Sequence, residues 1–344
     1  MNRKVLVSPL DWGLGHATRL IPLIQMLLKN NNQVTLAGKG RSLQMLKNAY
    51  PGLPCLEILS IKVSYPVNSR LTYLFFFLSL PRFLLSIYKD YYQLRKIIKN
   101  HEIQVVISDN RYGFYHKSLY SVLITHQLQL KFPPGLKWIQ TPANWFIKRN
   151  INRFSVCWVP DHENNGGLAG ELSHPVVSFK KSIYVGPLSR FSDIIISKGK
   201  HYPQLFLVGI VSGPEPQRTA FEEMIISKFI SSELPGYILR GITGTSRNIK
   251  TGSVQLIENP GTVQMAQLLK HAFYVVARGG YSTIMDLYTL NCPALLVPTP
   301  GQPEQEYLSK HLCNHSLFTF ISQSEFLAIE NFDKWMGINR EGSC

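Results

Sequence analysis

Short apolar runs alternate with segments of helical periodicity along the whole chain. The runs predict buried parallel strands, which are apolar throughout because helices cover both of their faces. The segments between them repeat apolar residues at the spacing of a helix. Predicted strands span residues 4–8, 33–38, 103–108, 122–125 and 156–160 in the first half and 205–211, 237–239, 254–257, 274–276 and 294–297 in the second. This alternation predicts an α/β fold with two Rossmann-like domains facing a central cleft.

A polar stretch without periodicity separates the two halves. We therefore assign residues 1–190 to a first domain, residues 191–204 to a linker and residues 205–344 to a second domain. The 344 residues suffice for two domains of ordinary size.

Residues 277–312 form the most informative segment, which reads as strand end, glycine turn, helix, buried strand, polar loop and second helix. Gly279 and Gly280 permit a tight turn that leaves backbone N–H groups uncovered. Ser282 and Thr283 are expected as N-caps of the helix that follows. A helix that begins at such a turn suits a phosphate, and Asp286, one turn later, is placed to accept hydrogen bonds from sugar hydroxyls. An ordinary βαβ turn explains the glycines equally well.

A second polar cluster follows the predicted strand at 294–297. Gln302, Glu304, Gln305 and Glu306 lie in and after the loop at its carboxyl end, the edge at which open α/β sheets bind ligands. Amides beside carboxylates suit the hydroxyls and phosphates of a nucleotide sugar. Two clusters on one edge favour a nucleotide-sugar site over an ordinary turn.

The loop after the first strand, residues 9–19, is rich in glycine and contains a histidine. Its spacing is not that of a dinucleotide-binding fingerprint. His16 and Asp11 are the candidate general bases. A glycine turn with an incidental histidine is the alternative.

Arg278-Gly279-Gly280 with Ser282, Thr283 and Asp286, followed by Pro298 and residues 302–307, resembles the donor-binding signature of GT-B glycosyltransferases. The pattern is most similar to glycosyltransferase family 28, the group of the N-acetylglucosaminyltransferase that makes lipid II. The resemblance implies that Asp286 binds the donor ribose and that Gln305 and Glu306 contact the donor sugar. Asp286 stands where the family has Glu, and Glu306 stands where it has a second Gln.

The resemblance extends to the first loop and the domain junction. Gly15-His16 matches the Gly-Gly-His loop that meets the acceptor or the donor phosphate, and residues 183–187 match the exit from the first domain. Ser212 and Gly213 match the loop that approaches the donor diphosphate. The last helical segment, residues 324–335, is expected to cross back to the first domain.

The reaction implied is an inverting, metal-independent transfer of a hexose-type sugar from a UDP-sugar, with no further cofactor. His16 or Asp11 would deprotonate the acceptor hydroxyl. The candidate donor-binding residues are Ser212, Gly213, Arg218, Arg240, Arg278, Gly279, Gly280, Ser282, Thr283, Asp286, Gln302, Gln305 and Glu306. The candidate acceptor-binding residues are Gly13, Gly15, Asp109, Asn110 and His126, for which capping and turn chemistry is the alternative.

The positive charge lies in the first half. Residues 1–190 hold 24 Lys and Arg against 8 Asp and Glu, whereas residues 191–344 hold 12 against 13. Without a nucleic-acid-binding motif, this asymmetry favours an anionic membrane surface or an anionic, lipid-linked acceptor over nucleic acid. Residues 71–98 are apolar and then basic, and the apolar part is too short to span a bilayer. They form either a buried helix followed by an exposed basic one or an interfacial membrane surface.

The chain begins without a signal-peptide pattern, and its five cysteines are scattered, which predicts reduced thiols and a cytoplasmic protein, peripheral on the inner face of the membrane. Two other functions are consistent with the sequence. One is a nucleotide-sugar 2-epimerase on the same fold, and the other is a non-catalytic basic binding protein.

Overall fold

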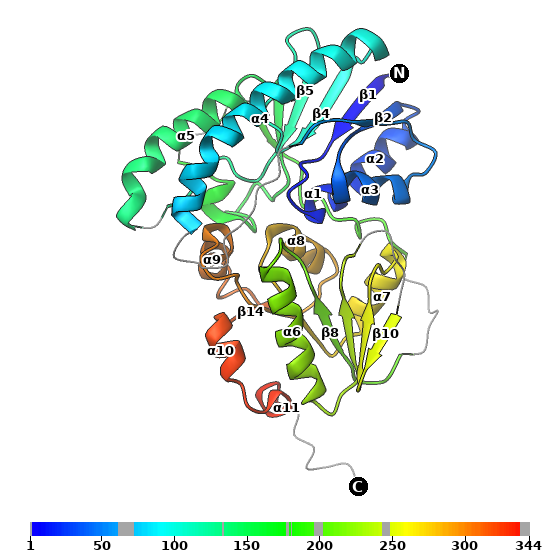
Figure 1. The fold of residues 1–344 in the computed structure, drawn as a ribbon, viewed down its shortest axis with the longest axis vertical. Coiled ribbons are helices and arrows are strands. Elements are labelled where there is room, and N and C mark those ends of the chain that lie inside the picture. The colour runs from blue at the N-terminus through cyan, green and yellow to red at the C-terminus, as the bar shows by residue number, and fades with distance from the viewer. Residues whose placement is uncertain are drawn as a thin grey trace. The chain divides into compact units, whose positions relative to one another are not determined.

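The computed structural model describes residues 2–60, 72–132, 134–176, 179, 181–195, 202–242 and 248–337, without the side chains of residues 72–79, 134 and 248. The chain divides into two compact units, Met1–Asp193 and Ile194–Cys344 (Figure 1). Residues 196–201 of the expected linker lie outside the described residues.

A parallel sheet forms the centre of the first unit. Within the described residues its order is β3-β2-β1-β4-β5-β6-β7, and all neighbouring strands are parallel. The strands are β1 Lys4–Ser8, β2 Gln33–Gly38, β3 Cys55–Glu57, β4 Val105–Asp109, β5 Tyr120–Ile124, β6 Val156–Val159 and β7 Ser182–Tyr184. The helices are α1 Leu14–Thr18, α2 Leu20–Lys29, α3 Gly40–Ala49, α4 Thr72–His101 and α5 Lys137–Ile151.

The residues of β1 alternate between two buried clusters. Val5 and Val7 pack with Leu20 of α2 on one face of the sheet. Leu6 packs with Leu94 of α4 on the other. Successive side chains of a strand point to opposite faces, so a strand covered on both faces must be apolar throughout. The polar residues of the unit therefore collect at the strand ends.

A second, mainly parallel sheet forms the centre of the other unit, in the order β10-β11-β9-β8-β12-β13-β14, with β10 antiparallel to β11. The strands are β8 Leu207–Ile210, β9 Gly236–Leu239, β10 Asn248–Thr251, β11 Val254–Ile257, β12 Tyr274–Ala277, β13 Ala294–Leu296 and β14 Phe318–Phe320. The helices are α6 Gln217–Ile230, α7 Thr262–His271, α8 Tyr281–Thr289, α9 Pro303–His311, α10 Gln323–Ala328 and α11 Phe332–Trp335.

Two expectations about helix starts are wrong. His16 lies in α1 rather than in an extended loop, because the chain turns into helix at Leu14 and Thr18 donates its hydroxyl to the Gly15 carbonyl at 3.0 Å. Ser282 and Thr283 lie inside α8 and do not cap it. The N-cap is Gly280, whose extended backbone lets the helix begin directly after the glycine turn.

The apolar and basic parts of residues 71–98 do not form two helices. α4 continues through Pro81 as one helix, and its half-buried Phe83 and Ile87 pack against a core cluster of the first unit. Leu71 and the side chains of residues 72–79 lie outside the described residues. None of the helices in the described ranges has the length and apolar character needed to span a bilayer.

The last segment forms two short helices instead of one. Phe326 of α10 and Phe332 of α11 are buried in the core of the second unit, together with Phe221 and Phe229 of α6. Both helices are therefore part of the second unit.

Candidate active site

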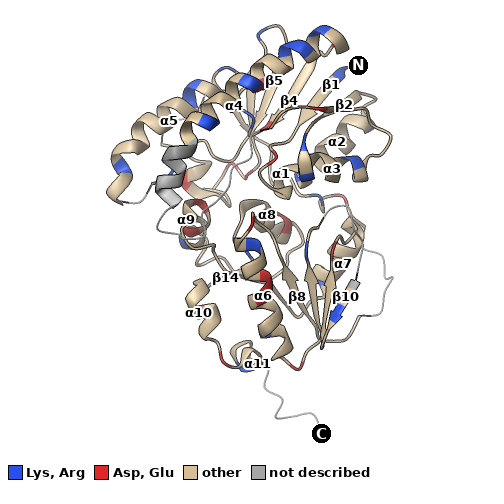
Figure 2. Cartoon of the chain, in the orientation of Figure 1, with Lys and Arg blue, Asp and Glu red and all other residues tan. Residues whose placement is uncertain are grey.

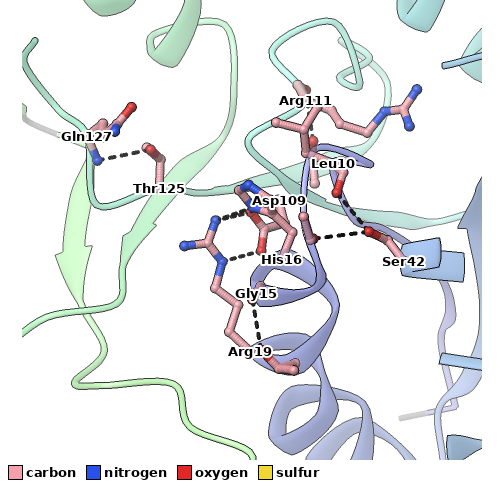
Figure 3. A network of polar contacts seen from close by, with 12 residues as sticks. Leu10, Gly15, His16, Arg19, Ser42, Asp109, Arg111, Thr125 and Gln127 are labelled. Atoms are coloured by element: carbon pink, nitrogen blue, oxygen red, sulfur yellow. Dashed lines mark hydrogen bonds and ion pairs between the residues drawn. The ribbon is translucent and has the colours of Figure 1, made fainter. Parts of the chain in front are cut away.

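Three polar side chains meet at the carboxyl end of β4 (Figure 3). Asp109 ends this strand, His16 comes from α1, and Arg19 lies between α1 and α2. Nδ1 of His16 lies 2.9 Å from Oδ1 of Asp109. Arg19 donates from Nε and Nη2 to the two carboxylate oxygens of Asp109, and its Nη2 lies 2.8 Å from Nδ1 of His16. Asp109 is thus held by a bidentate arginine and a histidine at once.

The charges of this trio follow from its burial. Asp109 and Arg19 are 0% and 1% exposed. Burial opposes the charge of Asp109, yet Arg19 and His16 hold its pKa below the usual value. Burial lowers the pKa of His16, and Arg19 and His126 add to this lowering against the opposing effect of Asp109. At neutral pH Asp109 is therefore an anion and His16 is a neutral imidazole.

A neutral imidazole with one nitrogen held by a carboxylate is the arrangement of an oriented general base. The His16 side chain keeps 20% of its surface exposed while its carboxylate partner is fully buried. Its Nε2, on the far side of the ring from Asp109, is the atom that can accept a proton.

Asp11 has a different environment. Its Oδ1 accepts a hydrogen bond from the backbone N–H of Ser42 at 3.5 Å, in the first turn of α3. Gly40 begins this turn at φ +64°, and a Cβ there would lie 2.5 Å from Oδ2 of Asp11. A carboxylate at a helix N-terminus is stabilised as an anion, which makes it a poor base. This position favours His16 over Asp11 as the base.

The predicted acceptor residues are not equally accessible. Asp109 and His126 are buried, and their expected contact with an acceptor stays a prediction. Asp109 contacts His16 and Arg19. Asn110 is half-buried and has a left-handed backbone, φ 53°, while Gly13 is exposed and Gly15 half-buried. These three remain candidates.

In the second unit, the glycine turn and the amide loop lie together, as the sequence predicts. A Cβ on Gly280 would lie 4.0 Å from Nε2 of Gln305. Gln305 accepts from the Thr299 N–H at 2.8 Å and donates to the side chain of Gln302, while Glu306 accepts from the Gly301 N–H at 2.7 Å. These side chains hold the loop before α9 beside the start of α8.

The helix starts at the carboxyl edge of this sheet differ in how they are capped. The N-cap of α8 is Gly280, which has no side chain that could cap the helix. At α6, Glu215 accepts from the backbone N–H of Thr219 at 3.2 Å and from its hydroxyl at 2.8 Å. The α6 terminus therefore holds a carboxylate of its own chain, whereas the residue at the N-cap of α8 is a glycine and supplies no such group. Ser212 and Gly213, which precede α6, remain predictions.

The arginines expected at the donor are engaged within the protein. Arg278 is 2% exposed, donates to the carbonyls of Val297 and Pro298 at 3.3 Å each, and lies 3.9 Å from the centre of the Phe221 ring. Burial lowers its pKa to about 10. Its side chain stabilises the end of β13, and the expectation that it neutralises a diphosphate is wrong for this structure.

Arg218 and Arg240 both bind Glu222. Arg218 donates to its Oε2 at 3.2 Å, and Nη2 of Arg240 lies 2.8 Å from its Oε1. Arg240 also lies 3.6 Å from Glu258. Sequence alone could not show that these cations are already neutralised by carboxylates, so their expected donor role is not supported.

Replacing Arg278 by methionine should lower the free energy of unfolding by about 1–3 kcal/mol, because buried carbonyls lose their donor. Chemical denaturation measures this loss. Nucleotide affinity of the folded protein should not change, since the Arg278 side chain is buried and donates to carbonyls of its own fold. A variant that keeps its stability and loses nucleotide binding would restore Arg278 to the donor site.

Residues 249–332 match the family model of the glycosyltransferase family 28 C-terminal domain. Solved glycosyltransferases share the fold of nearly the whole chain. The glycotransferase of kitacinnamycin has a TM-score of 0.64 at 13% identity, covering 94% of this chain and 87% of its own. The spinosyn forosaminyltransferase SpnP has a TM-score of 0.60 at 13% sequence identity, and the match covers 98% of this chain and 89% of SpnP. MurG of Acinetobacter baumannii has a TM-score of 0.52 at 11% sequence identity, and the match covers 94% of this chain and 86% of MurG. No curated protein matches the sequence.

The chain has the GT-B fold of these glycosyltransferases, and part of its second unit matches family 28. The predicted resemblance to family 28 and the predicted fold class are confirmed. The matched region contains α8, Asp286 and the start of α9 with Gln302, Gln305 and Glu306.

Sequence reasoning missed Arg19, which completes the trio with His16 and Asp109. A signal was present, because Arg19 follows His16 by three residues in an otherwise apolar helical segment and shares its helix face. Among the described residues, no group of three or more His, Cys, Asp or Glu side chains is arranged to bind a metal ion.

Proposed function

We propose that this glycosyltransferase moves a hexose-type sugar from a UDP-sugar to a hydroxyl of a lipid-linked or anionic acceptor, with inversion and without a metal ion. The observation that carries the donor site is the start of α8, which follows the glycine turn with Gly280 as its N-cap and beside which the amide of Gln305 lies. It lies within the region that matches family 28.

The reaction is one displacement. Nε2 of His16 accepts the proton of the acceptor hydroxyl, and the oxygen forms a bond to the anomeric carbon as the bond from that carbon to the phosphate oxygen breaks. The nucleoside diphosphate leaves with the electron pair. The positive end of α8 stabilises its negative charge, and Asp286 binds the ribose.

We further propose that the first unit binds the cytoplasmic face of a membrane. Trp138 and Trp145 are 74% and 62% exposed and lie two helical turns apart on α5. α5 also contains Lys137, Lys148 and Arg149 and no acidic residue. Aromatic and basic side chains on one helix suit the interface of an anionic bilayer. Lys and Arg also occur along α4 (Figure 2).

This surface is connected to the proposed base through aromatic packing. Phe83 of α4 lies 6.4 Å from the Phe146 ring of α5 and 6.1 Å from the Trp12 ring, which precedes α1. A lipid-linked acceptor would thus approach the part of the first unit that carries His16.

Titration of the purified protein with nucleotides and nucleotide sugars, without added metal, tests the donor. We expect a uridine nucleotide to raise the melting temperature and NAD to leave it unchanged, because a ligand stabilises the state that it binds. Replacing Asp286 by alanine should weaken this binding about tenfold or more, since hydrogen bonds to a charged group contribute about 1.5–3 kcal/mol.

Glu223 is the matched control for Asp286, because it is an exposed carboxylate on α6. The Glu223→Ala variant should bind nucleotide as the wild type does. Equal affinity of the Asp286→Ala variant would refute the ribose assignment. If no nucleotide changes the melting temperature, the UDP-sugar proposal fails.

A further inference from the structure

Nδ1 of His16 has two close neighbours with opposite requirements. Asp109 is ionised, so its Oδ1, 2.9 Å away, can only accept a hydrogen bond. Arg19 is a guanidinium, so its Nη2, 2.8 Å away, can only donate one. A neutral imidazole nitrogen is either a donor or an acceptor, and it satisfies one of these partners at a time.

The two choices are the two tautomers of His16, and they differ at the reacting atom. With the proton on Nδ1, the ring donates to Asp109 and Nε2 has a free lone pair, which is the form that acts as a base. With the proton on Nε2, the ring accepts from Arg19 at Nδ1 and cannot take a proton from an acceptor hydroxyl.

Arg19 affects the balance between the two tautomers. It is fully buried, and it binds both oxygens of Asp109 through Nε and Nη2. It therefore neutralises the carboxylate that would otherwise hold the proton on Nδ1, and it offers Nδ1 a donor of its own. A histidine paired with a carboxylate alone would have only the first choice.

We propose that Arg19 is a positioning residue that keeps His16 neutral and distributes its proton between the two ring nitrogens. The groups that act on His16 come from three parts of the first unit, namely Asp109 at the end of β4, Arg19 after α1 and His126 after β5. Arg19 makes His16 a weaker base. For the same reason, His16 stays unprotonated at a lower pH.

The sign of the pH effect follows from these charges. Arg19 is one of the causes that lower the pKa of His16, and Asp109 opposes them. When the arginine charge is removed, the pKa of His16 rises, and the imidazole becomes protonated at a pH where the wild type is still neutral. Activity that requires neutral His16 is then lost at the acid side and recovers at higher pH.

The test is the Arg19→Met variant with specifically labelled histidine. Nitrogen NMR should show both His16 tautomers in the wild type and the Nδ1–H form in the variant. The His16 titration should move to higher pH by about one pH unit or more, as expected for loss of a charge within hydrogen-bonding distance. Arg19→Lys keeps the charge and should titrate close to the wild type.

The same shift should be visible in the acid limb of kcat against pH, with turnover recovering at alkaline pH, which structural damage would not produce. This second readout rests on the proposed function, whereas the NMR readout does not. A shifted NMR titration without any transfer activity would refute the transferase proposal alone. If the methionine variant does not fold, Arg19→Gln removes the charge and keeps donor groups. An unchanged tautomer and titration in a folded variant would refute the role of Arg19.

Discussion

Replacing His16 by alanine should lower kcat by about 10²–10⁴-fold, the usual contribution of a positioned general base. The acceptor hydroxyl would have to lose its proton to water while the anomeric bond breaks. Nucleotide affinity should not change, because the donor residues belong to the second unit. Steady-state transfer at saturating donor measures kcat, and calorimetric titration measures nucleotide affinity.

His116 is the matched control for this experiment. It is a half-buried histidine of the same unit, with Nδ1 2.7 Å from the Ser118 hydroxyl, and it has no carboxylate partner among the contacts described. His116→Ala should keep its turnover. Near-normal kcat in the His16→Ala variant would reduce His16 to a structural residue of α1.

The apolar strands were predictable because burial on both faces leaves a signal that does not depend on the partner strands. Each predicted strand is present, with its ends shifted by at most two residues, for example Val105–Asp109 against the expected 103–108. The strands that the sequence did not reveal are β3, β7, β10 and β14, which are three or four residues long. These four strands are the edges of the two sheets, and of the residues in β3, β7 and β14 only Phe318 is buried, so they lack the continuous apolar run of a central strand.

The donor cluster was predictable for a related reason. Gly280 and Gln305 follow neighbouring parallel strands, β12 and β13, whose carboxyl ends share one edge. Two polar loops on adjacent strands must then lie close together. The region that matches family 28 is the region in which this argument holds.

The roles of charged residues were not predictable in the same way. His16 and Asp109 are 93 residues apart, and only the order of the first sheet, in which β1 adjoins β4, brings them together. The sequence around Arg278 does not show whether its side chain binds a phosphate or the carbonyls of its own fold. Its partners are decided by packing around Phe221, which no local pattern reports.

These corrections alter how the donor charge is stabilised. Arg278 donates to carbonyls and Arg218 and Arg240 pair with Glu222, so the donor proposal relies on the positive end of α8 instead of on these arginines. A helix terminus requires no side-chain movement to meet a phosphate. The donor proposal therefore depends on the backbone of Gly279 and Gly280 more than the sequence suggested.

Replacing both Trp138 and Trp145 by alanine should weaken binding to anionic vesicles by roughly 100-fold. Burying a large apolar side chain contributes about 1.5–3 kcal/mol, and an interface buries part of it, so the pair contributes about 3 kcal/mol. Cosedimentation with phosphatidylglycerol vesicles measures the partition coefficient. Adding salt should weaken the wild type as well, because Lys137, Lys148 and Arg149 on the same helix interact with the lipid charge.

The matched control is the Ile230→Ala, Leu327→Ala double variant, which removes two exposed apolar side chains of the second unit. It should bind vesicles as the wild type does, since its positions lie outside α5 and its basic residues. Transfer to a water-soluble acceptor should be normal in the tryptophan variant, because neither side chain belongs to the His16 trio. Equal vesicle binding by wild type and tryptophan variant would refute α5 as the membrane contact, and binding unaffected by lipid charge would refute an anionic surface. Loss of vesicle binding together with normal transfer in solution would separate membrane attachment from catalysis and place the attachment on this helix.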